Sequence, residues 1–303
     1  MEVNTKKSKL IHIEVYHRGV KKENRVLLDL QCKPEKELKD FIKSLSPRAV
    51  GYDLIRIGHS ADGGYLVPDD LEGIKACFSI GYGGVSVFEE MLGIDYEIKA
   101  FIADRVGNIM ERPLDRFIRW LRRLIRRRSK IFRFDLELDF ENKFVGKENN
   151  LTTIRLEDWI QKKCGLDFTG DLILQMDIEG AELDVLMDTS SDVLRKFRIM
   201  IIEFHSMAIY DLSIFLRFKH VFDKILEDFC VAHIHPNSSS RRFFCKGIEI
   251  PGTMEFTFIR KDRVLPDNRE LVFPHKLDRP NFSNCPEVIL PEIWQNRNET
   301  STI

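Results

Sequence analysis

The chain has 303 residues, of which 43% are hydrophobic and 31% are charged. Such a composition excludes a wholly disordered chain, and the length suits one large domain with extensions or two small domains. The formal net charge of −1 gives no reason to expect a nucleic-acid partner.

The cysteines and the first residues indicate a compartment. Six cysteines are scattered without a Cys-x-x-Cys pair, which favours free thiols over a metal or redox centre. The N-terminus lacks the apolar centre of a secretory signal. No apolar run approaches the roughly 18 residues of a membrane span. We therefore expect a cytoplasmic protein.

The first expected elements are two strands and a helix. Residues 10–16 and 25–30 have strand character, and apolar residues at helical spacing predict a helix over 35–45. These elements make a small hairpin-and-helix extension, residues 1–48. Residues 53–67 follow as a hairpin, because Ala61-Asp62-Gly63-Gly64 is typical of a tight turn.

From residue 76 onward, expected strands and helices alternate, which is the pattern of an α/β domain with a mostly parallel sheet. Strands are expected at 76–80, 98–103, 172–176, 199–204, 229–234 and 254–260. Helices are expected at 86–92, 114–128, 156–163, 181–187 and 212–226. We assign the main domain to residues 49–264 and the proline-containing stretch 265–303 to an irregular tail that packs on it.

A strongly basic segment, residues 112–133, contains nine arginines and Lys130 against one acid, Asp115. Its apolar residues fall on one face of an expected amphipathic helix. The opposite face carries Arg116, Arg119, Arg123 and Arg126. Such a helix either covers the sheet with a solvated face or contacts a polyanion or a membrane surface. We hypothesise that it holds an anionic substrate near the site; the oligomeric state is not predicted.

A glycine-rich turn, Gly81-Tyr82-Gly83-Gly84, follows the expected strand 76–80. Glycines let the backbone approach a ligand closely, and the next helix presents free N–H groups. Asp104 ends the following expected strand, where a carboxylate can accept hydrogen bonds from both ribose hydroxyls. These features predict a nucleoside site. Ser86 replaces the third glycine of a dinucleotide fingerprint, which favours S-adenosylmethionine over a dinucleotide.

An acidic run follows the most apolar expected strand, Leu172 to Met176. Asp177 ends that strand, and Glu179 and Glu182 come directly after it. Carboxylates at this position lie where open α/β sheets bind their ligands. We expect Asp177 and Glu179 to face the site, whereas Glu182 suits the positive end of the next helix.

Further motifs accompany these two stretches. They are Asp62-Gly63-Gly64-Tyr65, Ile202-Glu203-Phe204-His205, His233-Ile234-His235-Pro236-Asn237 and Leu277-Asp278-Arg279-Pro280-Asn281. With them, residues 50–291 resemble the FkbM family of S-adenosylmethionine-dependent methyltransferases, most distinctively in the run from Asp177 to Glu182. The resemblance implies a Rossmann-like methyltransferase fold, a mostly parallel sheet with an antiparallel terminal hairpin. It also implies S-adenosylmethionine as cofactor and O-methylation of a sugar, glycan or related metabolite.

The expected cofactor-binding residues combine the glycine turn with the two acids. They are Ser79, Gly81, Tyr82, Gly83, Asp104 and Asp177. Many methyltransferases carry an acid near the position of Ser79. Because serine has no charge, we expect the methionine ammonium to be contacted from elsewhere, by Asp177 or Asp62.

Methyl transfer to a hydroxyl needs alignment and a base. His205 follows an apolar strand at the same sheet edge as Asp177, and its ordinary pKa of about 6.5 suits proton removal near neutrality. Glu203 is expected to orient the His205 ring. We therefore expect His205, Glu203 and Asp177 to be catalytic.

Tentative substrate contacts are Asp62, Glu179, His233 and His235. His233 and His235 share one face of an expected strand, and a metal site with Asp177 and Glu179 is conceivable. No third ligand stands at a diagnostic spacing, so no metal is expected. Two other functions remain open: an NAD-dependent oxidoreductase, and a catalytically inactive nucleoside- or glycan-binding module.

Overall fold

The structure is a computed structural model. It describes the backbone of residues 10–17 and 20–28, and both backbone and side chains of residues 35–84, 86–105, 138–282, 285 and 288–295. The basic segment 112–133, with Arg116, Arg119, Arg123 and Arg126, lies outside the described residues.

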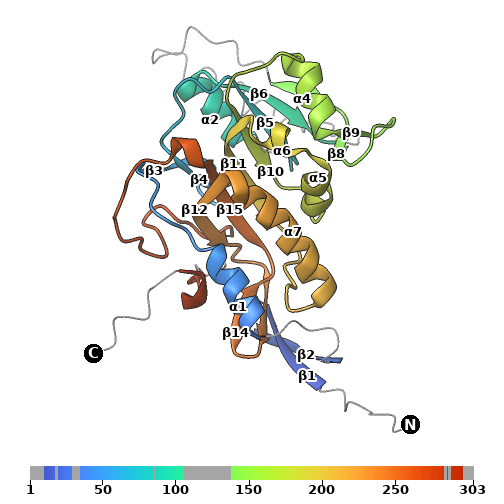
Figure 1. The fold of residues 1–303 in the computed structure, drawn as a ribbon, viewed down its shortest axis with the longest axis vertical. Coiled ribbons are helices and arrows are strands. Elements are labelled where there is room, and N and C mark those ends of the chain that lie inside the picture. The colour runs from blue at the N-terminus through green and yellow to red at the C-terminus, as the bar shows by residue number, and fades with distance from the viewer. Residues whose placement is uncertain are drawn as a thin grey trace.

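A seven-stranded sheet forms the centre of the main domain (Figure 1). Its order is β12-β15-β11-β10-β5-β6-β7. The strands are β5 (Ala76–Ile80), β6 (Lys99–Ala103), β7 (Asp139–Glu141), β10 (Leu172–Met176), β11 (Phe197–Phe204), β12 (Phe229–Pro236) and β15 (Met254–Arg260). Neighbours from β11 to β7 are parallel, whereas β15 runs antiparallel to both β11 and β12. The predicted α/β class, with a mostly parallel sheet and an antiparallel hairpin at its end, is confirmed.

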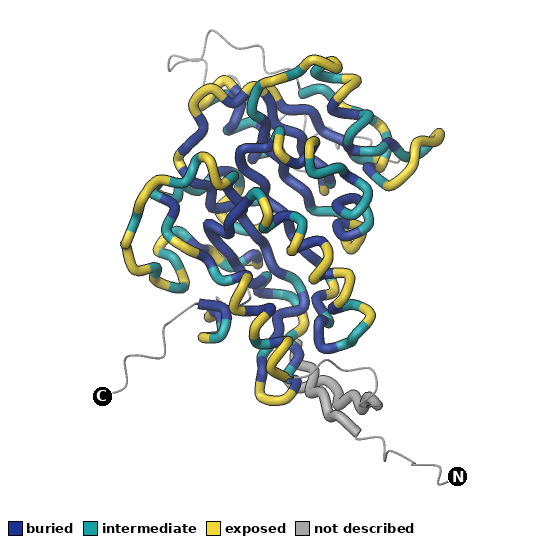
Figure 2. Tube along the Cα trace, in the orientation of Figure 1, coloured by how far each residue is buried: buried dark blue, intermediate teal, exposed yellow. Residues whose placement is uncertain are grey.

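Each face of this sheet is covered by a different set of elements. One face packs against α1 (Glu35–Ser44), α4 (Leu156–Cys164), α5 (Glu182–Asp188), α6 (Ser191–Leu194) and α7 (Leu212–Asp228). The other packs against α2 (Val87–Tyr96) and the antiparallel hairpin of β3 (Leu54–Gly58) and β4 (Gly64–Pro68). Alternate side chains of the inner strands enter the two cores, so β5, β10 and β11 are buried along their whole length (Figure 2), whereas β7 at the edge is partly exposed.

A second, four-stranded sheet joins distant parts of the chain. Its order is β14-β13-β1-β2, and all its pairs are antiparallel. The strands are β1 (Leu10–His17), β2 (Val20–Leu28), β13 (Arg241–Cys245) and β14 (Ile248–Pro251). The short strands β8 (Phe144–Gly146) and β9 (Thr153–Arg155) pair in parallel, and the 3-10 helices η2 (Lys261–Arg263) and η3 (Glu292–Trp294) follow later. The N-terminal hairpin thus pairs with a hairpin more than 200 residues away.

Polar residues interrupt the second core near one edge of the main sheet. Ser79, Gln175, Glu203 and Glu255 are all buried, and they alternate with apolar neighbours that enter the helix-covered core. The carboxyl ends of the parallel strands meet at this edge, which is where ligands bind in open α/β sheets. A buried polar row there favours a ligand site over ordinary packing.

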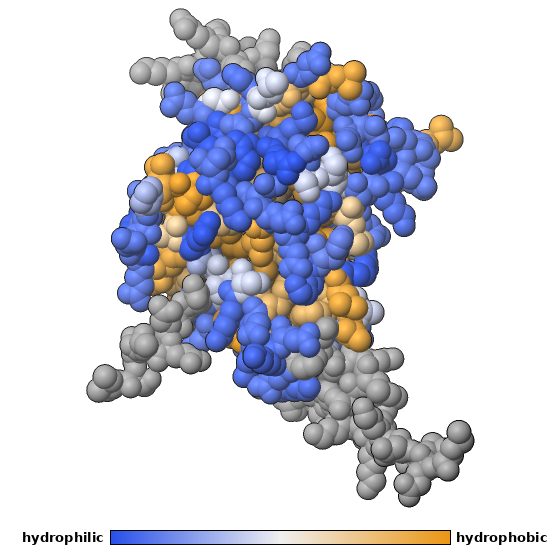
Figure 3. Space-filling view, in the orientation of Figure 1, coloured by the Kyte–Doolittle hydropathy of each residue, from blue (hydrophilic) through white to orange (hydrophobic). Residues whose placement is uncertain are grey.

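The face of the molecule drawn in Figure 3 is mainly polar where its residues are described. In Figure 3, hydrophilic residues cover most of the face in view, and hydrophobic residues gather in separate smaller areas. None of the helices in the described ranges combines the length and the apolar character that a bilayer crossing demands. Within the described ranges, the buried hydrophobic residues are concentrated in the two cores on either side of the main sheet.

Candidate functional site

The ends of β5 and β10 are joined closely, and Gly81 makes this possible. The Asp177 N–H donates to the Ile80 carbonyl at 2.9 Å. Gly81 adopts a φ of 89°, and a Cβ atom there would lie 1.7 Å from the Asp177 carbonyl oxygen. Only glycine fits such an approach. The glycine turn and the acidic run therefore meet at one point.

The rest of the glycine turn connects to Asp104. The Tyr82 N–H donates to the Asp104 carboxylate at 3.0 Å, and Asp104 directly follows β6. Gly83 also has a positive φ, of 53°, but a Cβ there would meet nothing within 4 Å. Gly83 thus leaves room beside the backbone. The predicted cofactor residues Gly81, Tyr82, Gly83 and Asp104 lie together at the carboxyl edge.

Ser79 is fully buried and belongs to a row of hydrogen-bonded side chains that could not be predicted from the sequence. Its hydroxyl lies 2.5 Å from Glu89 Oε1 and 2.8 Å from Gln175 Oε1, and the Gln175 amide donates to the Tyr65 hydroxyl at 3.3 Å. A hydroxyl has one proton, so it can donate to only one of two acceptors. The second contact needs a donor on the partner, either a protonated Glu89 or a Gln175 amide in the opposite orientation, and burial does raise the pKa of Glu89.

Glu89 therefore brings a carboxyl group to the position where Ser79 lacks one. It comes from α2, ten residues later in the chain, and its Oε2 atom is buried without a hydrogen-bond partner. Spacing along the sequence could not show this, because the contact depends on how α2 packs on β5.

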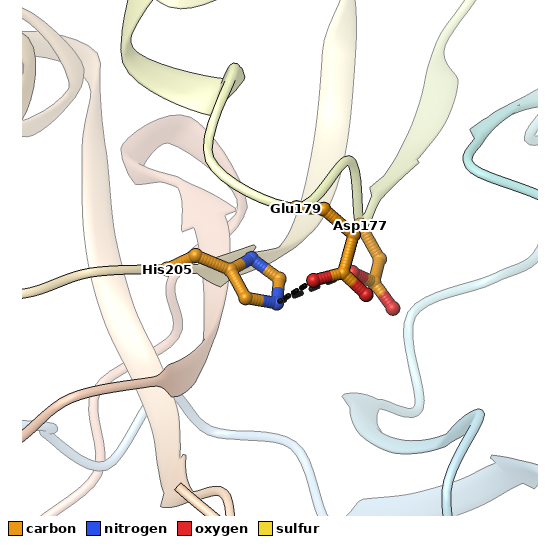
Figure 4. A group of neighbouring side chains, drawn as sticks. All are labelled: Asp177, Glu179 and His205. Atoms are coloured by element: carbon orange, nitrogen blue, oxygen red, sulfur yellow. Dashed lines mark ion pairs between the residues drawn. The ribbon is translucent and has the colours of Figure 1, made fainter. Parts of the chain in front are cut away.

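Asp177, Glu179 and His205 converge at the edge (Figure 4). The first two lie in the turn after β10, and His205 directly follows β11, which is the parallel neighbour of β10. His205 Nε2 lies 3.7 Å from Asp177 Oδ1 and 3.5 Å from Glu179 Oε2. The prediction that these three side chains share one edge holds in the structure.

Glu182, not Glu203, orients the His205 ring. Glu182 Oε1 lies 2.9 Å from His205 Nδ1 and accepts from the backbone N–H groups of Ile178 and Gly180 at 3.3 and 3.0 Å. Glu203 Oε1 is 3.9 Å from Nε2 and accepts instead from the Asn237 amide at 2.8 Å. The expectation that Glu203 sets the ring orientation is wrong, because the Glu182 side chain folds back under the turn.

The charges around His205 change its expected chemistry. Burial opposes a charged ring, but the hydrogen bond to Glu182 and the nearby carboxylates raise the pKa of His205 to about 9. Burial also raises the pKa of Asp177 to about 7, although His205 lowers it. An imidazole that holds its proton at neutral pH cannot accept another. Asp177 fits the role of base better than His205 does.

Further polar side chains adjoin this group through Glu203, whose Oε1 lies 3.9 Å from His205 Nε2. Burial, together with the charges of Glu255 and Asp177, raises the pKa of Glu203 well above its ordinary value. The Asn281 amide donates to Glu255 at 2.7 Å and to Asp62 at 3.3 Å. The Asn281 side chain comes from the C-terminal tail, and a sequence pattern offered no sign of this contact.

His233 and His235 lie on one face of β12, as predicted, but their partners differ from the expected ones. His233 Nε2 is 2.9 Å from Asp278 Oδ1, and His235 Nδ1 is 3.4 Å from Glu255 Oε2. Both imidazoles are buried. The structure thus groups Asp177 and Glu179 with His205, whereas His233 lies next to Asp278 and His235 next to Glu255.

Residues 126–229 match the family described as "Methyltransferase FkbM domain". The matched range includes Asp177, Glu179, Glu182 and His205. This is the family that the motifs resemble, so the resemblance is confirmed for that part of the chain. A comparison with curated proteins finds no match.

Similar solved structures include three proteins with low sequence identity. A fibrillarin/Nop5p complex chain is 10% identical with a TM-score of 0.34, over 62% of this chain and 74% of that chain. The METTL16 MTase domain is 10% identical with a TM-score of 0.35, over 76% and 70%. The spermidine synthase from Thermotoga maritima is 12% identical with a TM-score of 0.32, over 86% and 82%. Similarity at this level does not indicate what the present chain binds.

Proposed function

We propose that this protein is an S-adenosylmethionine-dependent O-methyltransferase that acts on a hydroxyl of a sugar, a glycan or a related metabolite. The observation that carries the proposal is the meeting of two loops. The Gly81–Gly83 turn with Asp104, and the acidic group around Asp177, lie at one edge of a parallel sheet. The match of residues 126–229 to a methyltransferase family supports it independently.

The residues present suit this cofactor. Asp104 follows β6, where a carboxylate can accept hydrogen bonds from ribose hydroxyls, and Gly83 leaves space for a ligand beside the backbone. The cofactor is positively charged at its sulfonium and ammonium groups, and Asp177 and Asp62 are carboxylates at this edge. When bound, S-adenosylmethionine supplies an activated methyl group, so the protein mainly aligns the acceptor and excludes water.

Proton removal from the acceptor hydroxyl falls to Asp177. S-adenosylmethionine would supply the methyl group, and the residues of this chain would hold the acceptor hydroxyl and take up its proton. The hydroxyl proton passes to the Asp177 carboxylate, whose pKa of about 7 suits a base near neutrality. His205 stays protonated beside it and stabilises negative charge on the acceptor oxygen.

We propose further that the acceptor carries negative charge, as a phosphorylated or lipid-linked glycan does. The basis is the sequence alone: nine arginines lie in residues 112–133, where Asp115 is the single acid. A labelled-methyl assay on matched neutral and phosphorylated glycans tests this. Methylation of the neutral glycans only would refute the anionic acceptor.

Calorimetric titration of the full chain with S-adenosylmethionine, its demethylated product and NAD tests the cofactor. We expect the first two to bind and Asp177→Asn to lower turnover by at least 100-fold, in line with loss of a general base. Binding of NAD alone would favour an oxidoreductase. Binding of S-adenosylmethionine without any methyl transfer would favour a non-catalytic module.

A further inference from the structure

We propose that Asp177, Glu179 and His205 form a binding site for one divalent cation, for which Mn²⁺ is the best match. One ligand atom from each residue lies within 4.8 Å of the other two. Two carboxylate oxygens and one imidazole nitrogen make a mixed donor set. Carboxylates suit Mg²⁺ and Mn²⁺, and the imidazole shifts the preference toward a transition metal.

The geometry leaves coordination positions for other ligands. In Figure 4, the Nε2 side of the His205 ring points toward both carboxylates. The distances from Nε2 to Asp177 Oδ1 and Glu179 Oε2 are 3.7 and 3.5 Å. Ligand atoms around one cation are separated by about 3 Å, so only small side-chain movements are needed, given cation–ligand distances of about 2.0–2.2 Å. Three protein ligands are the usual number at a catalytic metal, which keeps a position open.

The residue behind His205 supports the same reading. Metal-binding histidines usually donate their second ring N–H to a carboxylate, which fixes the tautomer and the ring orientation. Glu182 provides that partner at 2.9 Å from Nδ1. Glu182 is itself only 1% exposed and is held by two backbone N–H groups. Because Nδ1 donates to Glu182, the Nε2 lone pair of a neutral ring points to the two carboxylates.

Two further observations point to a missing partner. Asp177 Oδ1, which lies 3.7 Å from His205 Nε2, is buried and has no hydrogen-bond partner. Glu179 and Ser206, which carry and flank the ligands, both have left-handed backbones, with φ values of 56° and 54°. Non-glycine residues rarely adopt this conformation, and such strain gathers at functional sites.

The surrounding charge also favours a cation. Glu182 and Glu203, both buried, add their carboxyl groups to those of Asp177 and Glu179 around a single imidazole. Ionised carboxylates gathered around one imidazole repel one another. A divalent cation would offset this repulsion without any rearrangement of the backbone.

The inference rests on the proposed function in one respect, the nature of the acceptor. With the cation bound, Asp177 and His205 would serve as its ligands, in place of their roles as base and charge partner in the metal-free site. The cation would lower the pKa of a hydroxyl that coordinates it, so that the proton leaves to solvent and the cation stabilises the alkoxide. Two open positions would bind neighbouring oxygens of one acceptor. The acceptors of choice are therefore vicinal diols, as in a sugar ring, rather than isolated alcohols.

Titration of the full chain with Mn²⁺, followed by loss of the electron paramagnetic resonance signal of free Mn²⁺, tests the site. We expect one equivalent to bind. Glu179→Gln and His205→Gln should each weaken binding at least 10-fold. The matched control is Asp192→Asn on α6, since the Asp192 side chain is 87% exposed and that of Glu179 is 86% exposed. That control should bind Mn²⁺ like the wild type.

Absence of stoichiometric Mn²⁺ binding, or equal binding by Glu179→Gln and wild type, would overturn the proposal. Glu179 is exposed, so folding of that variant is not at stake. Titration with S-adenosylmethionine in the presence of EDTA separates the two proposals. If the cofactor binds and Mn²⁺ does not, the cation site fails and the methyltransferase proposal stands. If Mn²⁺ binds and the cofactor does not, the cation site stands and the methyltransferase proposal fails.

Discussion

Burial raises the pKa of the Glu89 carboxyl, and this has a consequence for stability. Its folded-state pKa is raised by burial, so the stability it contributes is full below the unfolded pKa of about 4.3 and is lost as the pH rises through the folded pKa. We expect Glu89→Gln, which keeps a donor for Ser79, to match the wild type near pH 4 and to be more stable than it at pH 9. The advantage should grow by up to about 1.4 kcal/mol per pH unit between the two pKa values.

Urea unfolding of both proteins across this pH range measures the effect. Glu90→Gln serves as control, because Glu90 lies one residue further along α2, is partly exposed and bonds to Ser86. A constant difference between Glu89→Gln and wild type at all pH values would show that Glu89 is charged in the folded protein.

Glu179 combines an exposed side chain with a strained backbone. Replacement by glycine removes the left-handed penalty of roughly 1–2 kcal/mol per residue, partly offset by the greater freedom of an unfolded glycine. We expect Glu179→Gly to raise the free energy of unfolding by about 1 kcal/mol while methyl transfer falls. Glu179→Gln keeps the strain and should lose activity without this gain in thermal stability. Equal stability of the two variants would contradict a strained Glu179.

The ring of His205 should titrate far above an ordinary histidine. Its pKa of about 9 depends mainly on Glu182, against the effect of burial. Proton NMR of the metal-free protein should show one imidazole with a midpoint near pH 9. Glu182→Gln should move that midpoint down toward about 6.5, whereas Asp184→Asn, on the same helix but exposed, should not. A midpoint near 6.5 in the wild type would restore His205 as a candidate base.

At the scale of single residues, local pattern identified the loops but not the partners. Asp177, Glu179 and His205 could be predicted to share an edge, because parallel neighbouring strands end there. Glu182 and Glu89 could not be assigned, since their roles depend on a side chain folding back and on helix packing. Gly81 was predicted as a ligand contact, but the structure shows that a glycine is needed there because the Asp177 backbone approaches so closely.

At the scale of elements, the two ends of β11 differ: its first residues carry a buried ion pair, and its last residues lead into the candidate site. Arg198, near its start, is 7% exposed and pairs with Asp171 at 2.6 Å while donating to the Glu72 carbonyl at 2.8 Å. His205 lies seven residues further along, which is about 23 Å in a strand. A change at Arg198 should therefore affect stability without affecting the site.

We expect Arg198→Met to lower the free energy of unfolding by about 3–5 kcal/mol, because the partners of a buried charge are left uncompensated. Arg195→Met removes a surface pair with Asp228 and should cost at most about 1 kcal/mol. Urea unfolding gives both values. Binding of Mn²⁺ and of S-adenosylmethionine to folded Arg198→Met should equal that of the wild type; a large loss of either would place Arg198 in the binding machinery.

The strands that could not be predicted from the sequence are mainly the short ones. Strands β5, β10 and β11 are nearly continuous apolar runs, a pattern typical of strands covered on both faces, and they could therefore be predicted. Strands β7, β8 and β9 have three residues each and show no readable period. Strands β13 and β14 were also missed, because their pairing with β1 depends on residues more than 200 positions away.

At the scale of the whole molecule, the C-terminal tail connects three distant regions through one side chain. Asn281 donates to Glu255 on β15 and to Asp62 in the β3–β4 turn, and its own oxygen accepts from the Ser238 N–H at 3.0 Å. Further along, Trp294 is fully buried and donates to the Glu249 carbonyl at 3.1 Å. The tail thus takes part in the hydrogen bonds of the buried polar residues near the site.

Asn281→Asp tests this connection, because it replaces a donor between two carboxylates with a third carboxylate. The new acid should have a raised pKa in the folded state, so its cost is absent below about pH 4 and grows as the pH rises. We expect the variant to lose about 2–4 kcal/mol at pH 8.5, within the range for an unpaired buried charge, and clearly less at pH 5.5. Urea unfolding at the two pH values measures the difference. The Ser238 contact is retained by an aspartate oxygen, so an equal loss at both pH values would mean that the tail is held by shape alone and not by the amide bridging Glu255 and Asp62.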